Sequence, residues 1–453
     1  MSIQRAHDVP AIPATARRLS RLLHGALHLP GDDDYDTQRQ PLHPTIDPRP
    51  AMVIEACGAA DVRTAVLAAR DHDLPLAVQA TGHGTHVPSD GGILLRTSTM
   101  ATVLVDPDRR VARVGPGATW ASVLAAAAPF GLAPLSGSSP SVGVTGYTLG
   151  GGLGWLSRKH GFAADSLLRA EVVTEDGGIV TASADEHPDL FWALRGGGGN
   201  FGVVTALEFR LHPVARVYAG TAYFAIDRAP QTLARYREWI ADVPDELSTA
   251  VLLTRLPSTP EVPEPVRGKR VLAIRAMHAG AAPDAERLLA PLRAVAGPAL
   301  MDGYRTTTFA AAAMGGTAPR HLDLVHDLPD AVIDVLVKAG EDEDSPISTV
   351  EVRHWGGAMA RPAADAGPVG HRTVPLSVIV DAQVPEVVDA LAPHATGGSF
   401  LNFLADPRRT QAAYTPADYQ GLREVKRTYD PDNVFRLNHN IAPAPAGQRR
   451  QTA

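Results

Sequence analysis

Cysteine is nearly absent from this sequence, which has a single one, Cys57, in 453 residues. One cysteine excludes a disulfide within the chain and is consistent with a reducing compartment. Because Cys57 ends the apolar run AMVIEAC at residues 51–57, we expect it to be a small buried side chain of the core.

Aromatic residues and basic charge are also scarce. Aromatic residues make up 5% of the chain, and its formal net charge is −7 at pH 7. Proteins that bind nucleic acid usually need a basic surface and rings that stack on bases, so this composition argues against a nucleic-acid partner. Residues 1–23 hold no long apolar segment, and no apolar run is long enough to span a bilayer. We therefore expect a cytoplasmic protein that does not associate with membranes.

What the chain does contain, from residue 51 onward, is a series of short apolar segments with alternating strand and helix periods. Residues 51–56 and 74–80 have the pattern of strands and residues 59–72 that of a helix, so we expect a β-α-β unit. Four apolar residues share one stripe of this helix: Val62, Ala65, Val66 and Ala69.

Further patterns predict strands at 91–97, 101–106 and 110–115, a helix at 118–131 and a hairpin at 167–182. In the strand that follows residue 202, alternation places on one face Leu207, Phe209 and Leu211, and on the other Glu208, Arg210 and His212.

The second half of the chain reads differently. Beyond Pro213 the segments are longer and indicate a mixed sheet covered by helices, which we expect to form a second domain up to about residue 395. The length of the chain also favours two domains, because 453 residues exceed one ordinary core. Near the end, a basic helix is predicted to stop at Asp430 and Pro431.

Three glycine-rich loops lie in the first half, at residues 81–84, 136–154 and 196–202. Glycine lets backbone N–H groups approach a ligand because no Cβ stands in the way, and chains bind phosphate oxygens in this manner. We interpret the loops as the site of a long phosphorylated cofactor, with an ordinary tight turn as the alternative for each. The stretch 136–155 is too rich in glycine to predict a helix or strand inside it.

Other motifs give little support to other chemistries. The sequence GGGNFG at 197–202 matches the dinucleotide pattern G-x-G-x-x-G, but it follows a predicted helix and precedes a strand, so we reject a Rossmann fold. His83 and His86 have no carboxylate or cysteine at ligand spacing, so we expect no metal site. The hydrolase and zinc motifs G-x-S-x-G, H-E-x-x-H and C-x-x-C do not occur.

Six stretches together, by their order and spacing, resemble the flavoprotein oxidases of the vanillyl-alcohol oxidase and berberine bridge enzyme type. They are RPAMVIEACGAADVRTAVLAARDHDLPLAVQATGHG, DGGILLRTSTMATVLVDPDRRVARVGPGATWASVL, GVTGYTLGGGLGWLSRKHGFAADSLLRAEVVTEDG, HPDLFWALRGGGGNFGVVTALEFRLHPV, EVRHWGGAMARPAADAG and YDPDNVFRLNHNI.

The resemblance implies an α+β fold with two domains, namely a PCMH-type FAD-binding fold and a substrate domain built on a mixed or antiparallel sheet. It assigns residues 1–214 and 396–453 to the FAD-binding domain, whose PCMH-type core covers about 46–216. Residues 215–395 then form the substrate-binding domain.

The resemblance also implies how FAD is held. In the family, a loop after a strand binds the FAD pyrophosphate through backbone amides, and its histidine is bonded to the 8α-methyl group of the flavin. That histidine is His83 here, and the other residues of the loop are Gln79, Ala80, Thr81, Gly82, Gly84 and Thr85. Thr81 stands where the family has a glycine.

Many relatives have a second flavin bond, from a cysteine in a segment like G-x-C-P-x-V-G. Here the segment reads GSSPSVG, with Ser139 at the place of the cysteine, so a second bond is excluded and a single histidyl bond is implied.

Further FAD contacts follow from the resemblance. The pyrophosphate and ribityl chain are assigned to Ser136, Gly137, Ser141, Gly143, Thr145, Gly146, Gly151 and Gly154. The adenosine end is assigned to Gly202 and Val203, and the isoalloxazine to Asn438 and Asn440. Backbone capping after a helix is the alternative role of the two asparagines.

The catalytic residues are less well defined. Relatives that oxidise alcohols use a tyrosine in a stretch like Y-x-N-Y, but this chain reads FLNF, with Phe400 and Phe403 at the two tyrosine places. The candidates that remain are Tyr147, Glu351, His354 and Asn402.

Glu351 and His354 lie in the strand pattern VEVRHW. Alternation places Glu351 and Arg353 on one face and His354 with the valines on the other, so Glu351 and His354 should not both face the flavin. A solvent-facing position on a half-exposed strand is the alternative for each.

We therefore expect an FAD-dependent oxidase that passes a hydride from a small amine or alcohol, such as a secondary metabolite, to the flavin and then to O2. The missing phenol favours an amine, which needs a weaker base. The alternatives are a flavin-dependent dehydrogenase or oxidative cyclase and, from another class, a flavoprotein-fold binding protein without turnover. The sequence leaves the substrate, the catalytic base and the oligomeric state open.

Overall fold

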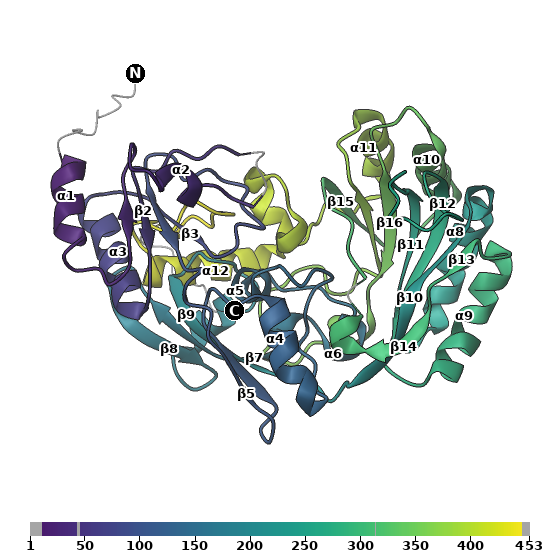
Figure 1. Cartoon of the computed structure of the whole chain (residues 1–453), viewed down its shortest axis with the longest axis horizontal. Coiled ribbons are helices and arrows are strands. Elements are labelled where there is room, and N and C mark those ends of the chain that lie inside the picture. Colours follow the sequence, from purple (N-terminus) through teal and green to yellow (C-terminus); the bar gives the residue numbers. More distant parts are fainter. Residues whose placement is uncertain (1–10, 43–45, 313, 446–453) are drawn as a thin grey trace.

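The computed structural model describes residues 11–42, 46–312 and 314–445. It has two lobes side by side (Figure 1). One lobe holds the N-terminal half together with the last helix, α12 (Pro416–Tyr429), and the other holds the strands and helices from β10 (Arg216–Ala225) to α11 (Pro385–Leu391).

A small sheet near the N-terminus begins the first lobe. Its strands, in spatial order, are β1 (Leu27–His28), β2 (Met52–Glu55), β4 (Ile93–Arg96) and β3 (Leu76–Gln79). Strands β2 and β3 are parallel to β4, which lies between them, and helix α3 (Ala59–Asp71) connects β2 to β3. The predicted helix stripe is confirmed, because its four apolar side chains are fully buried.

An antiparallel sheet of five strands completes the first lobe. In spatial order it holds β5 (Val103–Asp106), β6 (Val111–Val114), β9 (Val203–Arg210), β7 (Leu167–Val173) and β8 (Ile179–Ser183). It packs with the helices α4 (Trp120–Ala127), α7 (Pro188–Leu194) and α12.

The alternation predicted for β9 is confirmed for its apolar face, since Leu207, Phe209 and Leu211 are buried. His212 is buried as well, although it was predicted to face away. Its ring stacks on that of His160 with centroids 4.0 Å apart, and its Nε2 lies 3.1 Å from Ser166 Oγ, so its polar atoms are satisfied inside the protein.

The second lobe is built on one sheet of eight strands. The spatial order is β13 (Met301–Asp302), β10, β12 (Arg270–His278), β11 (Leu247–Arg255), β16 (Thr349–His354), β17 (Leu376–Val380) and β15 (His321–Val325), and β14 (Arg305–Thr308) pairs with β10. All of these pairings are antiparallel, so the sheet is not mixed.

The two faces of this sheet have different neighbours. Three helices cover one face, as Figure 1 shows: α8 (Ala229–Trp239), α9 (Ala282–Ala296) and α10 (Asp330–Glu341). The other face packs against the first lobe, where Leu252 and Ala273 share a core with Leu135, Trp155 and Leu156. Any site between the lobes is therefore lined by this second face.

Two predictions about the first lobe are wrong. Helix α5 (Val144–Leu149) lies inside the glycine-rich stretch 136–155, because the non-glycine residues between Gly143 and Gly150 include enough apolar side chains to bury one helix face. Cys57 is exposed rather than buried. It follows the end of β2 in the turn before α3, where its N–H donates to Asp61 Oδ2 at 2.8 Å.

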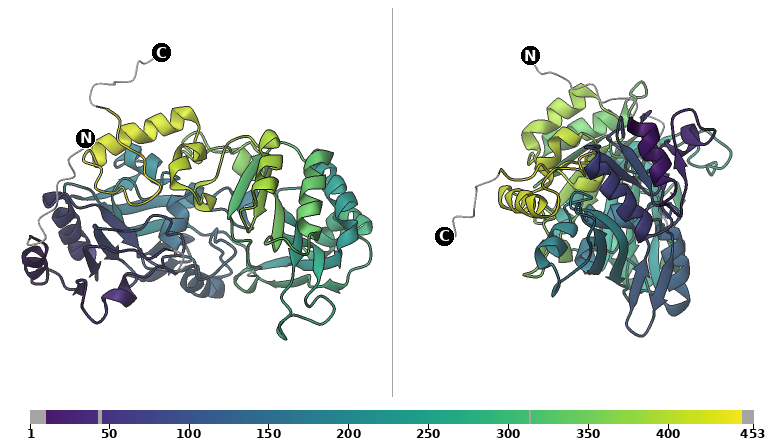
Figure 2. Two further views of the ribbon diagram at one scale, coloured as in Figure 1. Left: turned by 90° about the horizontal axis from the view of Figure 1, so that it is seen from above. Right: turned by 90° about the vertical axis from the view of Figure 1, so that its left-hand side faces the viewer.

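The C-terminal segment returns to the first lobe. Figure 2 shows α12, in yellow, lying over that lobe. Lys426 on this helix is fully buried and forms an ion pair with Asp430, and its Nζ also donates to Asn200 O at 2.8 Å. Beyond the helix, Val434 O accepts a hydrogen bond from Leu76 N–H at 3.0 Å, so the tail extends the edge of the small sheet.

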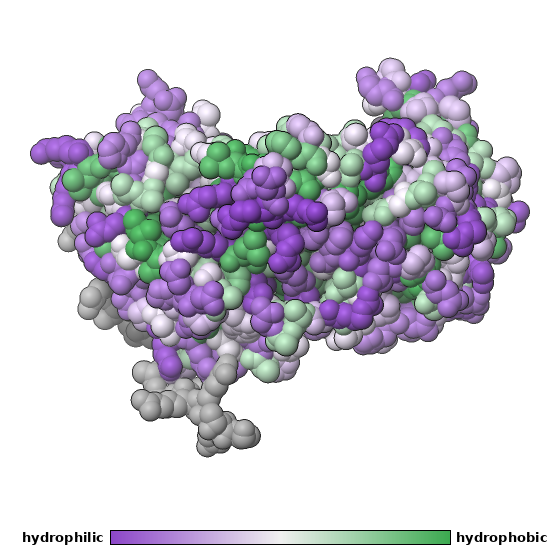
Figure 3. Space-filling model, turned by 90° about the horizontal axis from the view of Figure 1, so that it is seen from below, coloured by the Kyte–Doolittle hydropathy of each residue, from purple (hydrophilic) through white to green (hydrophobic). Residues whose placement is uncertain are grey.

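The face of the molecule drawn in Figure 3 is predominantly polar. The face in Figure 3 carries its apolar side chains in separate groups among polar ones. Among the described residues no helix is long and apolar enough to cross a membrane.

Candidate active site

The glycine-rich loops predicted to bind a cofactor come together in the first lobe. A Cβ on Gly143 would lie 3.4 Å from the Thr81 side chain, so the loop at 79–85 touches the start of α5. Gly198 N–H donates to Leu149 O at 2.9 Å, which joins the third loop to the end of the same helix.

The C-terminal tail completes this arrangement. Asn438 Nδ2 donates to Gly199 O at 3.1 Å, and Asn200 Nδ2 donates to His439 O at 3.1 Å. The rings of His86 and His439 lie 5.5 Å apart. Four segments distant in sequence therefore line one region: residues 79–86, 136–154, 196–202 and 437–441.

His83 is half-buried at the bend of its loop. Gly82 has φ +72°, and a Cβ there would lie 2.9 Å from Leu42 N, so only glycine fits this position. A Cβ on Gly84 would meet no atom within 4 Å. Gln79 holds the loop, because its Nε2 donates to Gln40 O at 3.0 Å.

The glycines of the second loop have two different roles. A Cβ on Gly137 or Gly152 would lie 2.9 or 2.5 Å from the ring of Tyr147, so these glycines allow the loop to close around that ring. Gly154 also packs beside Tyr147, and Gly151 packs against Phe400. Gly146, in contrast, is exposed and would meet nothing with a Cβ.

The remaining predicted cofactor residues are distributed between core and surface. Gly202 packs against Val172 on β7, and Val203, the first residue of β9, is buried in the core. Ser136 is buried, while Ser141 is exposed with its hydroxyl 3.0 Å from that of Ser139. Gly202 and Val203 are therefore expected to contact a ligand through their backbone atoms.

The residues of this region fit a large polar cofactor such as FAD. Several buried polar atoms have no hydrogen-bond partner among the described residues, although such atoms are nearly always paired. They are Thr145 Oγ1, Tyr147 OH, Thr148 Oγ1, Asn438 Oδ1 and Asn440 Oδ1. Together with the open faces of Gly84 and Gly146, they offer backbone and side-chain groups to a ligand along the length of the loops.

Glu351 and Arg353 lie next to this region, on the sheet face that meets the first lobe. Glu351 Oε1 and Arg353 Nε are 2.8 Å apart and form an ion pair. The Nε–H bond of Arg353 is not aligned with this oxygen, so the pair has no hydrogen bond between these two atoms. Thr317 Oγ1 donates to Glu351 Oε2 at 2.6 Å, and the Arg353 guanidinium lies 4.6 Å from the ring centre of Trp155. The solvent-facing alternative is wrong, because Glu351 is 0% and Arg353 7% exposed.

The charges around Glu351 keep it ionised. Burial alone would raise the pKa of its carboxyl group, but the positive charges of Arg353 and Arg275 outweigh burial and lower the pKa below its usual value. Burial raises the pKa of the Tyr147 phenol far above its usual value, and the charge of Arg353 offsets only part of this rise. At neutral pH the site therefore holds an ionised carboxylate and a neutral phenol.

His354 lies on the opposite face of β16, as alternation predicted. Its neighbours on that face, Val350 and Val352, pack with helices α8 to α10. Its Nε2 is 2.8 Å from Arg158 Nη1. Burial and the charge of Arg158 lower the pKa of His354 to about 2, so the imidazole is neutral. The structure therefore does not bring His354 together with Glu351.

Asn402 binds the second glycine loop through its side-chain amide. Its Oδ1 accepts a hydrogen bond from Gly152 N–H at 2.8 Å, and its Nδ2 donates to Tyr147 O at 3.2 Å. Phe400 is buried beside it, with its ring centre 5.5 Å from that of Phe162. Asn402 therefore positions the loop, and the two phenylalanines place apolar rings where the family has phenols.

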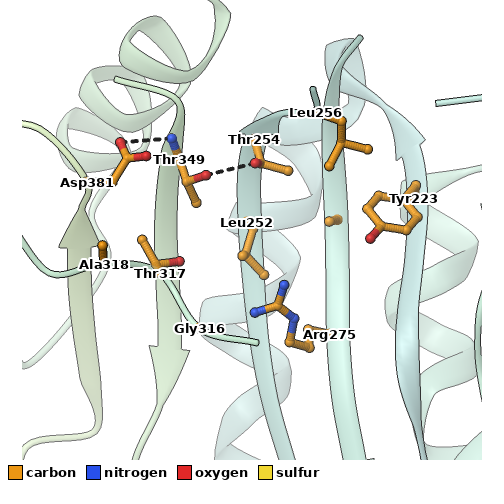
Figure 4. A pocket seen from close by; sticks show the side chains of 11 residues that line it. Tyr223, Leu252, Thr254, Leu256, Arg275, Gly316, Thr317, Ala318, Thr349 and Asp381 are labelled. Atoms are coloured by element: carbon orange, nitrogen blue, oxygen red, sulfur yellow. Dashed lines mark hydrogen bonds between the residues drawn. The ribbon is translucent and has the colours of Figure 1, made fainter. Parts of the chain in front are cut away.

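Sequence reasoning missed Arg275. It lies on β12 in the wall of a cavity of about 180 Å³ (Figure 4). The strand register places Leu252 of this wall directly beside Glu351, so both lie on the same face of the sheet. The available signal was Arg275 in the middle of the stretch RVLAIRAMHAG, with apolar residues directly on both sides of it. Among the described residues, no group of three histidine, cysteine, aspartate or glutamate side chains could hold a metal ion.

Two family models match the chain. One, described as FAD binding domain, covers residues 50–183, and the other, described as Berberine and berberine like, covers residues 399–442. The (R)-6-hydroxynicotine oxidase of Paenarthrobacter nicotinovorans is 30% identical over 435 residues, which are 87% of this chain and 92% of that protein. The uncharacterized FAD-linked oxidoreductase YgaK of Bacillus subtilis is 26% identical over 451 residues, or 93% of this chain and 97% of that protein.

Solved structures give the same result. The crystal structure of 6-hydroxy-D-nicotine oxidase from Arthrobacter nicotinovorans has a TM-score of 0.78 and 25% identity, covering 93% of this chain and 98% of the other. Xylooligosaccharide oxidase from Myceliophthora thermophila C1 shares the fold, with a TM-score of 0.80 and 21% identity over 96% of this chain and all of its own. These matches confirm the predicted α+β PCMH-type fold. The chain belongs to the FAD-linked oxidases of the vanillyl-alcohol oxidase and berberine bridge enzyme type, and it is an FAD-dependent oxidoreductase.

Proposed function

We propose that this enzyme oxidises a small organic amine, and that its FAD is held by the four converging segments and attached covalently through His83 alone. The observation that carries the proposal is the position of the Glu351–Arg353 pair on the sheet face that meets Tyr147 and Trp155. This places a charged, buried recognition group opposite the loops that would hold the cofactor.

The absence of a phenolate base favours an amine over an alcohol. Phe400 and Phe403 carry no hydroxyl group, and the phenol of Tyr147 has a pKa raised by burial, so it stays protonated at neutral pH. An alcohol needs a base to remove its O–H proton, whereas an amine can enter with a free electron pair. One relative is named for the oxidation of (R)-6-hydroxynicotine, a compound with an amine nitrogen, which agrees with this choice.

When bound, FAD would accept one hydride equivalent, that is, two electrons and a proton, from a substrate C–H bond. The chain has four tasks around it. The segment 79–86 and the C-terminal tail hold the cofactor, Asn402 fixes the Tyr147 loop, and the rings of Phe162, Trp355 and Phe400 exclude water behind that loop. Glu351, kept ionised by Arg353, accepts hydrogen bonds from polar groups of the substrate and orients it.

Attachment through His83 alone is supported by the residues present. Its loop bends at Gly82, and the open face of Gly84 leaves room for a bulky ring system next to the imidazole. Ser139 cannot form the second bond, and the one cysteine, Cys57, is exposed in the turn before α3. We expect acid-precipitated protein to keep its yellow colour and His83→Ala to release its FAD under the same conditions.

A spectroscopic assay tests the proposed activity. The purified protein is mixed without oxygen with a panel of amines and matched alcohols, and the visible absorption of the flavin is followed. Bleaching by amines, with return of colour and formation of H2O2 in air, is the expected result. Bleaching that air does not reverse would favour a dehydrogenase or cyclase, bleaching by alcohols alone would contradict the amine assignment, and a colourless protein would contradict FAD binding.

A further inference from the structure

The cavity beside Arg275 is large enough for one small ring or a short chain. Its volume is about 180 Å³, and a cavity of about 150 Å³ in another protein is known to hold benzene. Strands β10, β11, β12 and β16 form its floor, and its lining includes Tyr223, Leu252, Thr254, Arg275, Thr317 and Asp381. Figure 4 shows the Arg275 guanidinium directed between Leu252 and Gly316.

The cavity is connected to the candidate active site through Thr317. This residue lines the cavity, and its hydroxyl donates to Glu351 Oε2 at 2.6 Å. Glu351 and Arg275 are close enough for the charge of each to affect the pKa of the other. A molecule in the cavity therefore lies beside the Glu351–Arg353 pair.

The charges at this place are not balanced. Two guanidinium groups, on Arg275 and Arg353, face one carboxylate, on Glu351. The second carboxylate of the lining belongs to Asp381, away from Arg275 in the cavity wall (Figure 4). It accepts hydrogen bonds from Ser348 N–H, Ser348 Oγ and Thr349 N–H. Arg353 is the ion-pair partner of Glu351, so the positive charge of Arg275 is in excess.

Arg275 also keeps hydrogen-bonding capacity for a ligand. Its Nε donates to Thr221 Oγ1 at 3.3 Å, and its Nη1 is 3.5 Å from Gly315 O, at the limit of a hydrogen bond. Among the described residues, Nη2 has no hydrogen-bond or ion-pair partner. Burial lowers the pKa of Arg275, which reflects a cation with too little compensation from its surroundings.

We propose that this cavity binds a carboxylate on Arg275, so that the substrate of the enzyme is a small organic acid. A carboxylate offers two oxygens in a plane and matches the fork of a guanidinium, and it would balance the excess charge. The proposal rests on the proposed function for the position of the active site, and it adds the chemical class of the substrate. The amine and the carboxylate would then belong to one molecule, with the carboxylate on Arg275.

Calorimetric titration of the purified full-length protein tests the proposal with matched probes. Benzoate and phenylacetate are compared with benzamide and phenylacetamide, which have the same shape without the charge. We expect the acids to bind at least about 10-fold more tightly than the amides, because charged hydrogen bonds are worth more than neutral ones. The variant Arg275→Met should weaken binding of the acids about 10- to 100-fold and leave binding of the amides unchanged.

Two further variants show whether binding of the acids depends on the guanidinium group itself, on its positive charge alone, or on an unspecific effect of the substitution. Arg275→Lys keeps the charge without the fork and should retain part of the preference for acids. Arg287→Met removes a positive charge from the exposed side of α9 and should bind like the original protein. Equal affinity for acids and amides, no binding of either acid at millimolar concentration, or an unchanged preference in Arg275→Met would overturn the proposal.

The readouts distinguish this proposal from the proposed function. Calorimetry detects binding whether or not the flavin reacts, and flavin colour and bleaching are recorded on the same samples. A protein that binds acids but is not bleached by any amine contradicts the proposed function alone. A protein that is bleached by neutral amines and ignores acids contradicts the carboxylate site alone.

Discussion

At the scale of single residues, Glu351 and Arg353 place two opposite charges inside the protein. Both side chains are removed from water, and each depends on the other for charge compensation. Thr317 and Trp155 complete their surroundings. A buried pair of this kind is costly to form, which argues that it is kept for recognition rather than for stability.

Removal of the carboxylate charge should be strongly destabilising. Glu351→Gln leaves Arg353 and Arg275 buried without a counter-charge, and we expect a loss of about 3–5 kcal/mol in the free energy of unfolding. Thr317→Val removes one hydrogen bond to the same carboxylate and should cost about 1–2 kcal/mol. Urea unfolding of both variants measures the difference, and equal losses would contradict the role of charge.

The raised pKa of Glu175 predicts that the free energy of unfolding depends on pH. Burial, and then the negative charges of Asp430 and Asp432, raise the pKa of Glu175 to about 7 from 4.5. The folded state then holds a proton that the unfolded state has lost, so stability is fully present below pH 4.5 and falls as the pH rises to about 7.

The size of this effect can be measured by chemical unfolding at pH 5 and pH 8. Glu175→Gln cannot ionise and should remove most of the loss in the free energy of unfolding between these two values, which solvent screening reduces to about 1–2 kcal/mol. Glu186→Gln, which changes an exposed carboxyl group, serves as the control and should keep the dependence of the original chain. The same slope in both variants would exclude Glu175 as its source.

Single residues were predicted from the sequence with uneven success. Alternation in VEVRHW correctly separated Glu351 from His354, because the side chains of a strand point to opposite faces in turn. It could not show that both faces are covered, since the helices on one side and the first lobe on the other come from distant parts of the chain. The half-exposed alternative failed for that reason, and the partners Thr317 and Trp155 could not be named.

At the scale of elements, the turn between α5 and Leu153 depends on one side chain from far along the chain. Asn402 satisfies both Gly152 N–H and Tyr147 O. Glycines with positive φ, Gly151 and Gly152, let the chain reverse there. Gly152 in the turn packs against the ring of Tyr147 on α5, so the order of the turn sets the shape of the wall next to the candidate active site.

Asn402→Leu should loosen this turn without unfolding the protein. Both backbone groups lose their partner, and we expect the Gly152 amide to exchange its hydrogen at least about 10-fold faster, which corresponds to about 1.4 kcal/mol of local stability. Hydrogen–deuterium exchange followed by mass spectrometry measures this effect. Gln411→Ala, at an exposed position nearby in sequence, is the control. Unchanged exchange in both variants would show that Asn402 does not hold the turn.

Elements with a regular period were predictable and the others were not. The stripe of α3 follows a 3.6-residue period that one segment of sequence defines, and the structure confirms it. Helix α5 was missed because glycine content was weighed above the apolar residues Val144 and Leu149 that bury it. The eight-stranded sheet places β16 between β11 and β17, and no local pattern specifies such neighbours.

At the scale of the whole molecule, Arg158 joins the two lobes. It lies on α6 (Ser157–His160) and is 3% exposed, and its guanidinium donates to Leu247 O, Val243 O and Trp355 O in the second lobe. The ion pair of Arg372 with Asp165 makes a second link, at 2.7 Å. No sequence pattern indicates the Arg158 link, because most of its partners are backbone carbonyl groups from distant parts of the chain.

Arg158→Met should reduce the cooperativity between the lobes. Loss of several buried hydrogen bonds is expected to cost about 3 kcal/mol or more, most of it at the interface. Calorimetric melting should then change from one transition to two. Arg169→Met, at an exposed position of β7 whose side chain contacts Thr181 of the same lobe, should melt like the original chain. A single transition in the Arg158 variant, merely shifted, would show that the contact stabilises the molecule without coupling its halves.

The return of the tail to the first lobe has a consequence for biosynthesis. Val434 binds the edge strand that starts at Leu76, and Asn438 and His439 contact the loop at 199–200. The loops of the candidate site are therefore synthesised early, but the residues that complete the site are synthesised late. We therefore expect nascent chains to hold FAD firmly only after the segment beyond α12 has left the ribosome and has folded onto the first lobe.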